Sequence, residues 1–222
     1  MNEHTAVVIG ASGLIGNYIV NLLLTDDHFT KIRLLVRRKL EIHHPKLEQV
    51  IVNFNDIEDY TNKFGDGEYI FCSVGTTTKK VRGNFEAYSK VDFDIPFNAA
   101  KIGASKKFKK FLIVSSAGAN ANARSFYLRL KGRLENALKE FEFESVSFLR
   151  PGMLLGKRNE YRRGEKILQG ITKIISGFLF SSLKKYHSIQ GKDVANAMIE
   201  QSKKSVTGIH ILEYNEMMNL KH

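Results

Sequence analysis

With 222 residues and a formal net charge of +11, the chain is long enough for one α/β domain, residues 1–222, with a substantial core. Its single cysteine, Cys72, excludes an internal disulfide, and the scattered histidines and acidic residues predict no metal site. Because no apolar run is long enough to cross a bilayer and no signal-peptide pattern opens the chain, we expect a cytoplasmic protein that is not embedded in a membrane.

The first predicted strand, at residues 5–9, leads into a glycine-rich turn that starts a helix. The turn reads Gly10-Ala11-Ser12-Gly13-Leu14-Ile15-Gly16. We expect Gly10 to make the tight turn, Gly13 to let the backbone approach a phosphate, and Gly16 to let the helix lie close to the sheet. The unpaired amides of the first helical turn suit a pyrophosphate. The turn therefore predicts a dinucleotide site, although its G-x-x-G-x-x-G spacing also fits a turn that binds nothing.

The second predicted strand, at residues 31–38, ends in a pair of arginines. An acid at this position would accept hydrogen bonds from the ribose of NAD, whereas arginine pairs with the extra phosphate of NADP. Here Arg37 and Arg38 occupy the position and no acid follows before Glu41. The pair favours NADP(H), with two solvated arginines at a strand end as the alternative.

The next two strand ends would lie against the same cofactor. A strand at residues 49–54 ends in Asn53 and Phe54, which would flank the adenine ring unless Phe54 belongs to the core. A strand at residues 68–74 ends at Val74 and continues into Gly75 and Thr76. These small residues would let the strand end pass beneath the cofactor.

Strands and helices continue to alternate in the middle of the chain. A helix at 84–101, bent by Pro96, precedes a strand at 111–118, and a helix at 125–141 precedes a strand at 144–150. The lysine-rich run at 101–110 falls where a helix ends, so its cations are solvated and we expect no nucleic-acid partner. This alternation predicts a Rossmann-like, doubly wound parallel sheet.

Residues 151–222 depart from that rhythm and are expected to form a small substrate-side region of the same domain. Apolar residues recur along 164–183 with lysines at both ends, which predicts an amphipathic helix. We interpret this helix as a substrate-side lid or a packed helix, with a membrane-surface helix as the alternative. A helix at 192–203 and a strand at 208–213 follow.

The residues that could carry chemistry lie around the strand at 111–118. Tyr127 and Lys131 are four residues apart on a predicted helix, so both side chains fall on one face. Ser115 and Ser116 end the preceding strand, at the same sheet edge as the glycine turn. An ammonium stabilises a nearby phenolate, so such a tyrosine can protonate a carbonyl oxygen held by a serine as hydride reaches the carbon. The alternative is a half-buried aromatic residue beside a solvated lysine.

Four motifs of the chain occur together in one known superfamily. They are Gly10-x-x-Gly13-x-x-Gly16, Ser115-Ser116, Tyr127-x-x-x-Lys131 and Arg150-Pro151-Gly152. On these motifs the chain resembles the short-chain dehydrogenase/reductase superfamily, in its extended or atypical branch. Three longer stretches are Cys72-Ser73-Val74-Gly75-Thr76-Thr77, Phe126-Tyr127-Leu128-x-x-x-Lys131-Gly132-x-x-Glu135 and Phe148-x-Arg150-Pro151-Gly152-x-Leu154-Leu155. They are more closely similar to the Tat-interacting-protein (CC3-like) oxidoreductases.

This resemblance implies a Rossmann fold that binds NADP(H). It assigns the catalytic roles to Ser116, Tyr127 and Lys131, although Ser115 and Ser116 are not distinguished at this point. The residues that would line the nicotinamide pocket are Pro151, Gly152 and Met153. Asp92 stands where many members carry the asparagine of a catalytic tetrad, which is a departure from the family pattern.

We expect an NADP(H)-dependent oxidoreductase that acts on a carbonyl or alcohol of a small molecule. One alternative is an NADP(H)-binding regulatory protein that presents its conformation to a protein partner, because relatives are described as regulators as well. The other is a nucleotide-sugar epimerase-like enzyme. It is disfavoured because only about 70 residues follow Pro151, which leaves little chain for a bulky substrate site.

Overall fold

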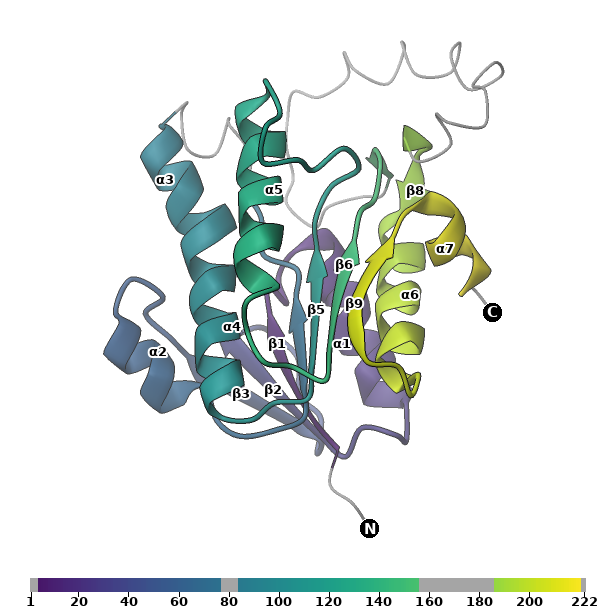
Figure 1. The fold of residues 1–222 in the computed structure, drawn as a ribbon. Coiled ribbons are helices and arrows are strands. Elements are labelled where there is room, and N and C mark those ends of the chain that lie inside the picture. Colours follow the sequence, from purple (N-terminus) through teal and green to yellow (C-terminus); the bar gives the residue numbers. More distant parts are fainter. Residues whose placement is uncertain (1–3, 77–83, 156–185, 221–222) are drawn as a thin grey trace.

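The computed structural model describes residues 4–76, 84–155 and 186–220 and contains a seven-stranded parallel sheet (Figure 1). The strand order is β3-β2-β1-β4-β5-β6-β9, and every neighbouring pair is parallel. The strands are β1 (Thr5–Ile9), β2 (Lys31–Val36), β3 (Leu47–Ile51), β4 (Tyr69–Cys72), β5 (Lys110–Val114), β6 (Ser145–Leu149) and β9 (Gly208–Leu212). The predicted doubly wound parallel sheet is confirmed.

The chain runs outward from β1 to β3 and then crosses back to the other side of β1, where it forms β4. The connection that follows β1 therefore leads toward β2 on one side, and the connection that follows β4 leads toward β5 on the other side. In open α/β sheets this reversal leaves a crevice at the carboxyl edge, which is where ligands bind. The glycine turn follows β1, so it lies at this crevice.

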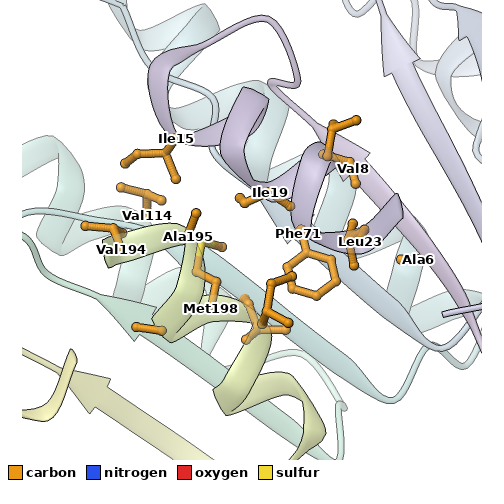
Figure 2. Close-up of a cluster of buried hydrophobic side chains, with 14 of the residues drawn as sticks. Ala6, Val8, Ile15, Ile19, Leu23, Phe71, Val114, Val194, Ala195 and Met198 are labelled. Atoms are coloured by element: carbon orange, nitrogen blue, oxygen red, sulfur yellow. The ribbon is translucent and has the colours of Figure 1, made fainter. Parts of the chain in front are cut away.

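One face of the sheet is covered by α1 (Leu14–Thr25) and α6 (Gly191–Lys203). Figure 2 shows Ile15, Ile19 and Leu23 of α1 in one cluster with Val194, Ala195 and Met198 of α6 and with strand residues such as Val8 and Phe71. Their three- and four-residue spacing places these apolar side chains on one stripe of each helix, which is why both helices bury that stripe against the sheet. Two segments from opposite ends of the chain thus enclose one core.

The other face is covered by α2 (Ile57–Lys63), α4 (Ile95–Ser105) and α5 (Phe126–Leu138) (Figure 1). These three helices bury apolar side chains in a second core, which includes Tyr60 of α2, Ala99 of α4 and Leu134 of α5. Cys72 lies in this core and is fully buried, so burial raises the pKa of its thiol to about 11. The parallel strands are therefore apolar on both sides, as a sheet between two helical layers requires.

The helix expected over 84–101 is not regular. It consists of α3 (Phe85–Ser89), a π-helical turn at Lys90–Asp94 and α4, in which the amide of Ile95 donates to the carbonyl of Lys90, five residues earlier. Pro96 has no amide hydrogen to continue the regular pattern, and the wider turn lies directly before it. The turn carries Asp92, which is buried.

The region beyond β6 contains elements that the sequence did not indicate. Strands β7 (Leu154–Leu155) and β8 (Ile189–Gln190) form a second, two-stranded parallel sheet, and α7 (Tyr214–Asn219) follows β9. Each is too short to give a periodic pattern. The amphipathic helix predicted over 164–183 lies outside the described residues.

Candidate active site

The glycine turn depends on close backbone packing. Gly10 has a φ of +93°, and a Cβ there would lie 2.7 Å from the carbonyl carbon of Ser73, beyond the end of β4. A Cβ on Gly16 would lie 2.1 Å from the oxygen of Gly10, so the first turn of α1 presses on the turn itself rather than only on the sheet. The geometry therefore requires glycine at both positions.

The start of α1 offers backbone amides to a ligand. Gly13 is the N-cap residue and makes no side-chain cap, while its own amide donates to the carbonyl of Gly10 at 2.9 Å. Ser12 is exposed, whereas Ile15 is buried in the core and Leu14 packs toward Gly191 at the start of α6. Any contact of Leu14 and Ile15 with a phosphate is consequently made by their amides. This cradle of glycines and uncapped amides fits a pyrophosphate.

The residues predicted for the adenosine end differ in their surroundings. Arg37 and Arg38 are exposed immediately after β2. Asn53 and Phe54 lie beyond β3 rather than in it, because this strand is shifted toward the N-terminus relative to the prediction. Phe54 is half-buried and edge-on to Tyr60, with ring centroids 4.8 Å apart, so it is packed on the core as the alternative reading expected.

Asn53 has a local structural role, since its side-chain oxygen accepts from the amide of Asn55 at 3.2 Å. A further residue at this end, Gln49, gave no signal in the sequence. Its side-chain oxygen accepts from the amide of Leu40, and its Nε2 donates to the carbonyls of Leu40 and Ile42. Gln49 thereby holds the loop that follows the two arginines against β3.

At the end of β4, the predicted cofactor residues meet a buried ion pair. Val74 is half-buried, Gly75 is exposed, and the amide of Thr76 donates to Oδ2 of Asp92 at 2.7 Å. The other carboxylate oxygen of Asp92 lies 3.2 Å from Nζ of Lys131, and both side chains are almost fully buried. Asp92 thus joins this strand end to α5.

Tyr127 and Lys131 lie together, with Nζ of Lys131 6.0 Å from the centroid of the Tyr127 ring. Burial by itself lowers the pKa of Lys131, but the Asp92 carboxylate and Tyr127 outweigh it, so the pKa is raised and the side chain is an ammonium ion. The ring of Tyr88 stands edge-on to that of Tyr127, with centroids 6.3 Å apart. A charged lysine next to a half-buried phenol is an arrangement suited to proton transfer.

The two serines after β5 have different environments. The hydroxyl of Ser115 is buried and donates to Oε1 of Glu135 at 2.5 Å, and the same carboxylate binds the guanidinium of Arg150 at 3.0 and 2.5 Å. Ser116 is half-buried, and within the described part of the chain its hydroxyl makes one long hydrogen bond, 3.4 Å, to the carbonyl of Ala117. Ser115 is therefore a member of a buried network, whereas Ser116 is more accessible and its hydroxyl is only weakly held.

Pro151, Gly152 and Met153 follow β6 after Arg150. Pro151 is buried and its carbonyl accepts from the amide of Ala117 at 2.9 Å, which joins the exits of β5 and β6. A Cβ on Gly152 would lie 2.5 Å from the carbonyl oxygen of His187, whereas Met153 is exposed. The segment thus leaves β6 beside the exit of β5, which carries Ser116.

Comparison with known proteins places the chain in a family. The HIM1 family model matches residues 40–186. The chain belongs to the HIM1 family. Protein HTATIP2 of Rattus norvegicus is 32% identical to this HIM1 protein over 168 residues, which cover 74% of the chain and 69% of HTATIP2. Protein FMP52, mitochondrial, of Eremothecium gossypii is 30% identical over 218 residues, covering 97% of the chain and 96% of FMP52. The resemblance to the Tat-interacting-protein oxidoreductases is confirmed.

Solved structures share the fold of this HIM1 protein. A UDP-N-acetylglucosamine 4-epimerase from Methanobrevibacter ruminantium has a TM-score of 0.70 at 19% identity and covers 96% of this chain and 77% of its own. A mutant uronate dehydrogenase from Agrobacterium tumefaciens, complexed with NAD, has a TM-score of 0.70 at 14% identity and covers 95% and 76%. At such identities the similarity concerns the fold alone, and it confirms the Rossmann-like architecture.

One expectation is corrected by the relatives. The FMP52 proteins of several yeasts are named mitochondrial, so the prediction of a cytoplasmic protein is wrong. Its basis was the absence of a signal-peptide pattern, which does not bear on mitochondrial targeting. Among the described helices, none is long and apolar enough to cross a membrane. Over the same residues, no group of three or more His, Cys, Asp or Glu side chains is placed to hold a metal ion.

Proposed function

We propose that this HIM1 protein is an NADP(H)-dependent oxidoreductase of the short-chain type, which reduces a carbonyl or oxidises an alcohol on a small molecule. The observation that carries the proposal is the placement of the charged Lys131 beside Tyr127, next to strand ends that adjoin the glycine turn. The fold and family support a Rossmann oxidoreductase-like protein. The identity of the substrate and the choice of NADP(H) belong to the proposal.

The residues fit a dinucleotide. The glycine turn and the amides at the start of α1 would hold the pyrophosphate, and Val74, Gly75 and Thr76 would pass beneath the cofactor. The nicotinamide would lie against Pro151, Gly152 and Met153. When bound, the nicotinamide supplies or accepts the hydride.

The chain itself would handle the proton. In reduction, the phenol of Tyr127 donates its proton to the carbonyl oxygen, and the ammonium of Lys131 stabilises the phenolate that remains. The hydroxyl of Ser116 orients that oxygen by a hydrogen bond. In oxidation, the phenolate accepts the proton of the alcohol instead.

Tyr127→Phe tests the catalytic assignment. The variant is expected to bind NADPH as the unmodified protein does, while kcat for any substrate found in a panel of aldehydes and ketones falls about 100-fold or more. Tyr18→Phe, an exposed tyrosine on α1, is the matched control and should keep full activity. Activity of Tyr127→Phe equal to that of the unmodified protein would remove the tyrosine as the acid. If NADPH binds and no carbonyl accelerates its oxidation, the regulatory protein becomes the better interpretation.

The preference for NADP(H) over NAD(H) is tested by nucleotide binding and by substitution of Arg37 and Arg38. Isothermal titration is expected to show tighter binding of NADPH than of NADH, because the exposed guanidinium groups can pair with the 2′-phosphate. Replacing both arginines with alanine should weaken NADPH binding at least about tenfold and leave NADH binding unchanged. Arg133→Ala, which removes an exposed positive charge from α5, controls for the general field of the protein. Equal affinity of the unmodified protein for both nucleotides would rule out this assignment.

A further inference from the structure

Lys131 has a buried carboxylate partner on another element. Its Nζ lies 3.2 Å from Oδ1 of Asp92, and only 4% and 2% of the two side chains are exposed. Two opposite charges in such a dry environment attract each other strongly, and either charge alone would be costly to bury. The pair is therefore a single unit, and neither charge is readily lost without the other.

The position of Asp92 is set by its backbone and by a second hydrogen bond. It lies in the π-helical turn Lys90–Asp94, a rare helix type that often marks functional sites. Its second oxygen, Oδ2, accepts from the amide of Thr76 at 2.7 Å. This hydrogen bond fixes the carboxylate to Thr76, four positions after the end of β4 and at the crevice proposed for the cofactor. Asp92 thus spans from the strand exit to the lysine.

Other ionisable groups near the pair come from three elements. Tyr127, on α5 itself, lies beside Lys131, and Tyr88 of α3 stands next to Tyr127 and Asp92. Cys72 of β4 adjoins the pair as well, and burial raises its pKa to about 11, so it is a neutral thiol at neutral pH. Burial also raises the pKa of Tyr88, with Asp92 and Tyr127 acting in the same direction, so its phenol stays neutral.

The acidic residue of α5 is Glu135, one turn beyond Lys131, and it is already bound by Arg150. Among these neighbours, the carboxylate of Asp92 is consequently the group that balances the ammonium of Lys131.

We propose that Asp92 is the counter-ion and positioning residue of Lys131, holding the ammonium charged and in place beside Tyr127. The role in catalysis rests on the function proposed above, whereas the counter-ion role does not. An asparagine could accept the hydrogen bond from Thr76 but would supply no charge to Lys131. The carboxylate therefore matters for its charge, and this distinguishes the proposal from simple packing.

The charge has a consequence for the pH dependence of stability. In the unmodified protein the pKa of Lys131 is raised above 10.5, so the stabilisation by the pair is present below pH 10.5 and is lost as the pH rises through the raised pKa. Asp92→Asn removes the largest cause that raises the pKa of Lys131, and burial, which lowers this pKa, becomes the dominant effect. The stability of this variant should then rise with pH as the uncompensated ammonium loses its proton.

The experiment measures Tm against pH for the protein without ligands, from pH 7 to pH 10.5. At pH 7, Asp92→Asn is expected to lower Tm by on the order of 10 °C, and the difference from the unmodified protein should shrink steadily toward pH 10.5. Asp94→Asn, an exposed acid two positions away, is the matched control and should follow the unmodified protein throughout. A Tm difference that is constant over this range would overturn the proposal.

A second variant covers the case in which Asp92→Asn does not fold at pH 7. Asp92→Asn combined with Lys131→Met removes both charges and keeps the volume of the lysine stem. The double variant is expected to be more stable than Asp92→Asn alone. The difference in Tm between the double variant and the unmodified protein should stay the same from pH 7 to pH 10.5. If Lys131→Met fails to relieve the loss, the two charges do not form a unit and the inference is wrong.

Activity provides a separate readout once a carbonyl substrate is known. The kcat of Asp92→Asn should decline at a lower pH than that of the unmodified protein, because Lys131 loses its charge earlier, while KM for NADPH changes little. A uniform decrease at every pH would show that Asp92 has only a structural effect on catalysis. If no carbonyl is turned over, the proposed function fails, and the Tm profiles still decide whether Asp92 is the counter-ion.

Discussion

Two ion pairs start from buried side chains on successive turns of α5, and they are built differently. Lys131 pairs with Asp92, which is tied to the amide of Thr76. Four residues later, Glu135 binds Arg150 through both carboxylate oxygens and also accepts from Ser115. The first pair stands beside Tyr127, where a charge can act on a reacting group, whereas the second joins the ends of two strands.

The second pair has the properties of a structural clamp. Its carboxylate accepts three hydrogen bonds, two from the guanidinium of Arg150 and one from the hydroxyl of Ser115. The hydrogen bond with Glu135 raises the pKa of Arg150, although burial of the guanidinium lowers it. Ser115 leaves β5 and Arg150 leaves β6, so the clamp sets the spacing between the strand exits. One helix therefore carries a pair that joins two strand exits and a pair for which we propose a role in chemistry, and substitutions can separate the two.

The largest effect is expected for Glu135→Ala. It leaves the guanidinium of Arg150 and the hydroxyl of Ser115 without their main partner, which should lower the free energy of unfolding by about 3–5 kcal/mol. Urea unfolding measures this loss, with Glu140→Ala, an exposed acid beyond α5, as the control. A loss no larger than that of the control would show that the clamp does not stabilise the fold.

The two serines should give the next contrast. Ser115→Ala is expected to cost about 1.5–3 kcal/mol of stability because the buried Glu135 loses a donor, while turnover of the folded enzyme persists. Ser116→Ala should leave stability nearly unchanged and reduce kcat about 100-fold, since its hydroxyl is proposed to orient the substrate oxygen. Unfolding curves and kinetics of both variants check this pair of expectations. The opposite outcome would exchange the roles of the two residues.

The smallest effect concerns the outer partner of Arg150. Glu213 lies 3.9 Å from its guanidinium and is partly exposed, so the contact is weak compared with that of Glu135. Glu213→Gln retains an acceptor for the cap of α7 and should change the unfolding free energy by less than about 1 kcal/mol. The same urea titration is the measurement. A loss approaching that of Glu135→Ala would place Glu213 inside the clamp.

Several features of the site were accessible from the sequence because they are local. Tyr127 and Lys131 were expected on one face from their four-residue spacing, and their side chains do lie together. The glycine turn was expected between a strand and a helix, and Gly10 does adopt a positive φ. The shift of β3 was not foreseen, because strand ends depend on pairing with a neighbouring strand rather than on their own composition.

By itself, the sequence determined the alternation of strands and helices up to β6, the glycine turn and the face of α5 that carries Tyr127 and Lys131. These follow from periodicity and from backbone conformations that few residues other than glycine adopt. Only the tertiary structure decided that Ser115 is bound by Glu135, that Gln49 holds the loop after the arginines, and that Asp92 faces Lys131. Each of these contacts joins residues from different elements, and a buried charge finds its partner only when packing brings those elements together.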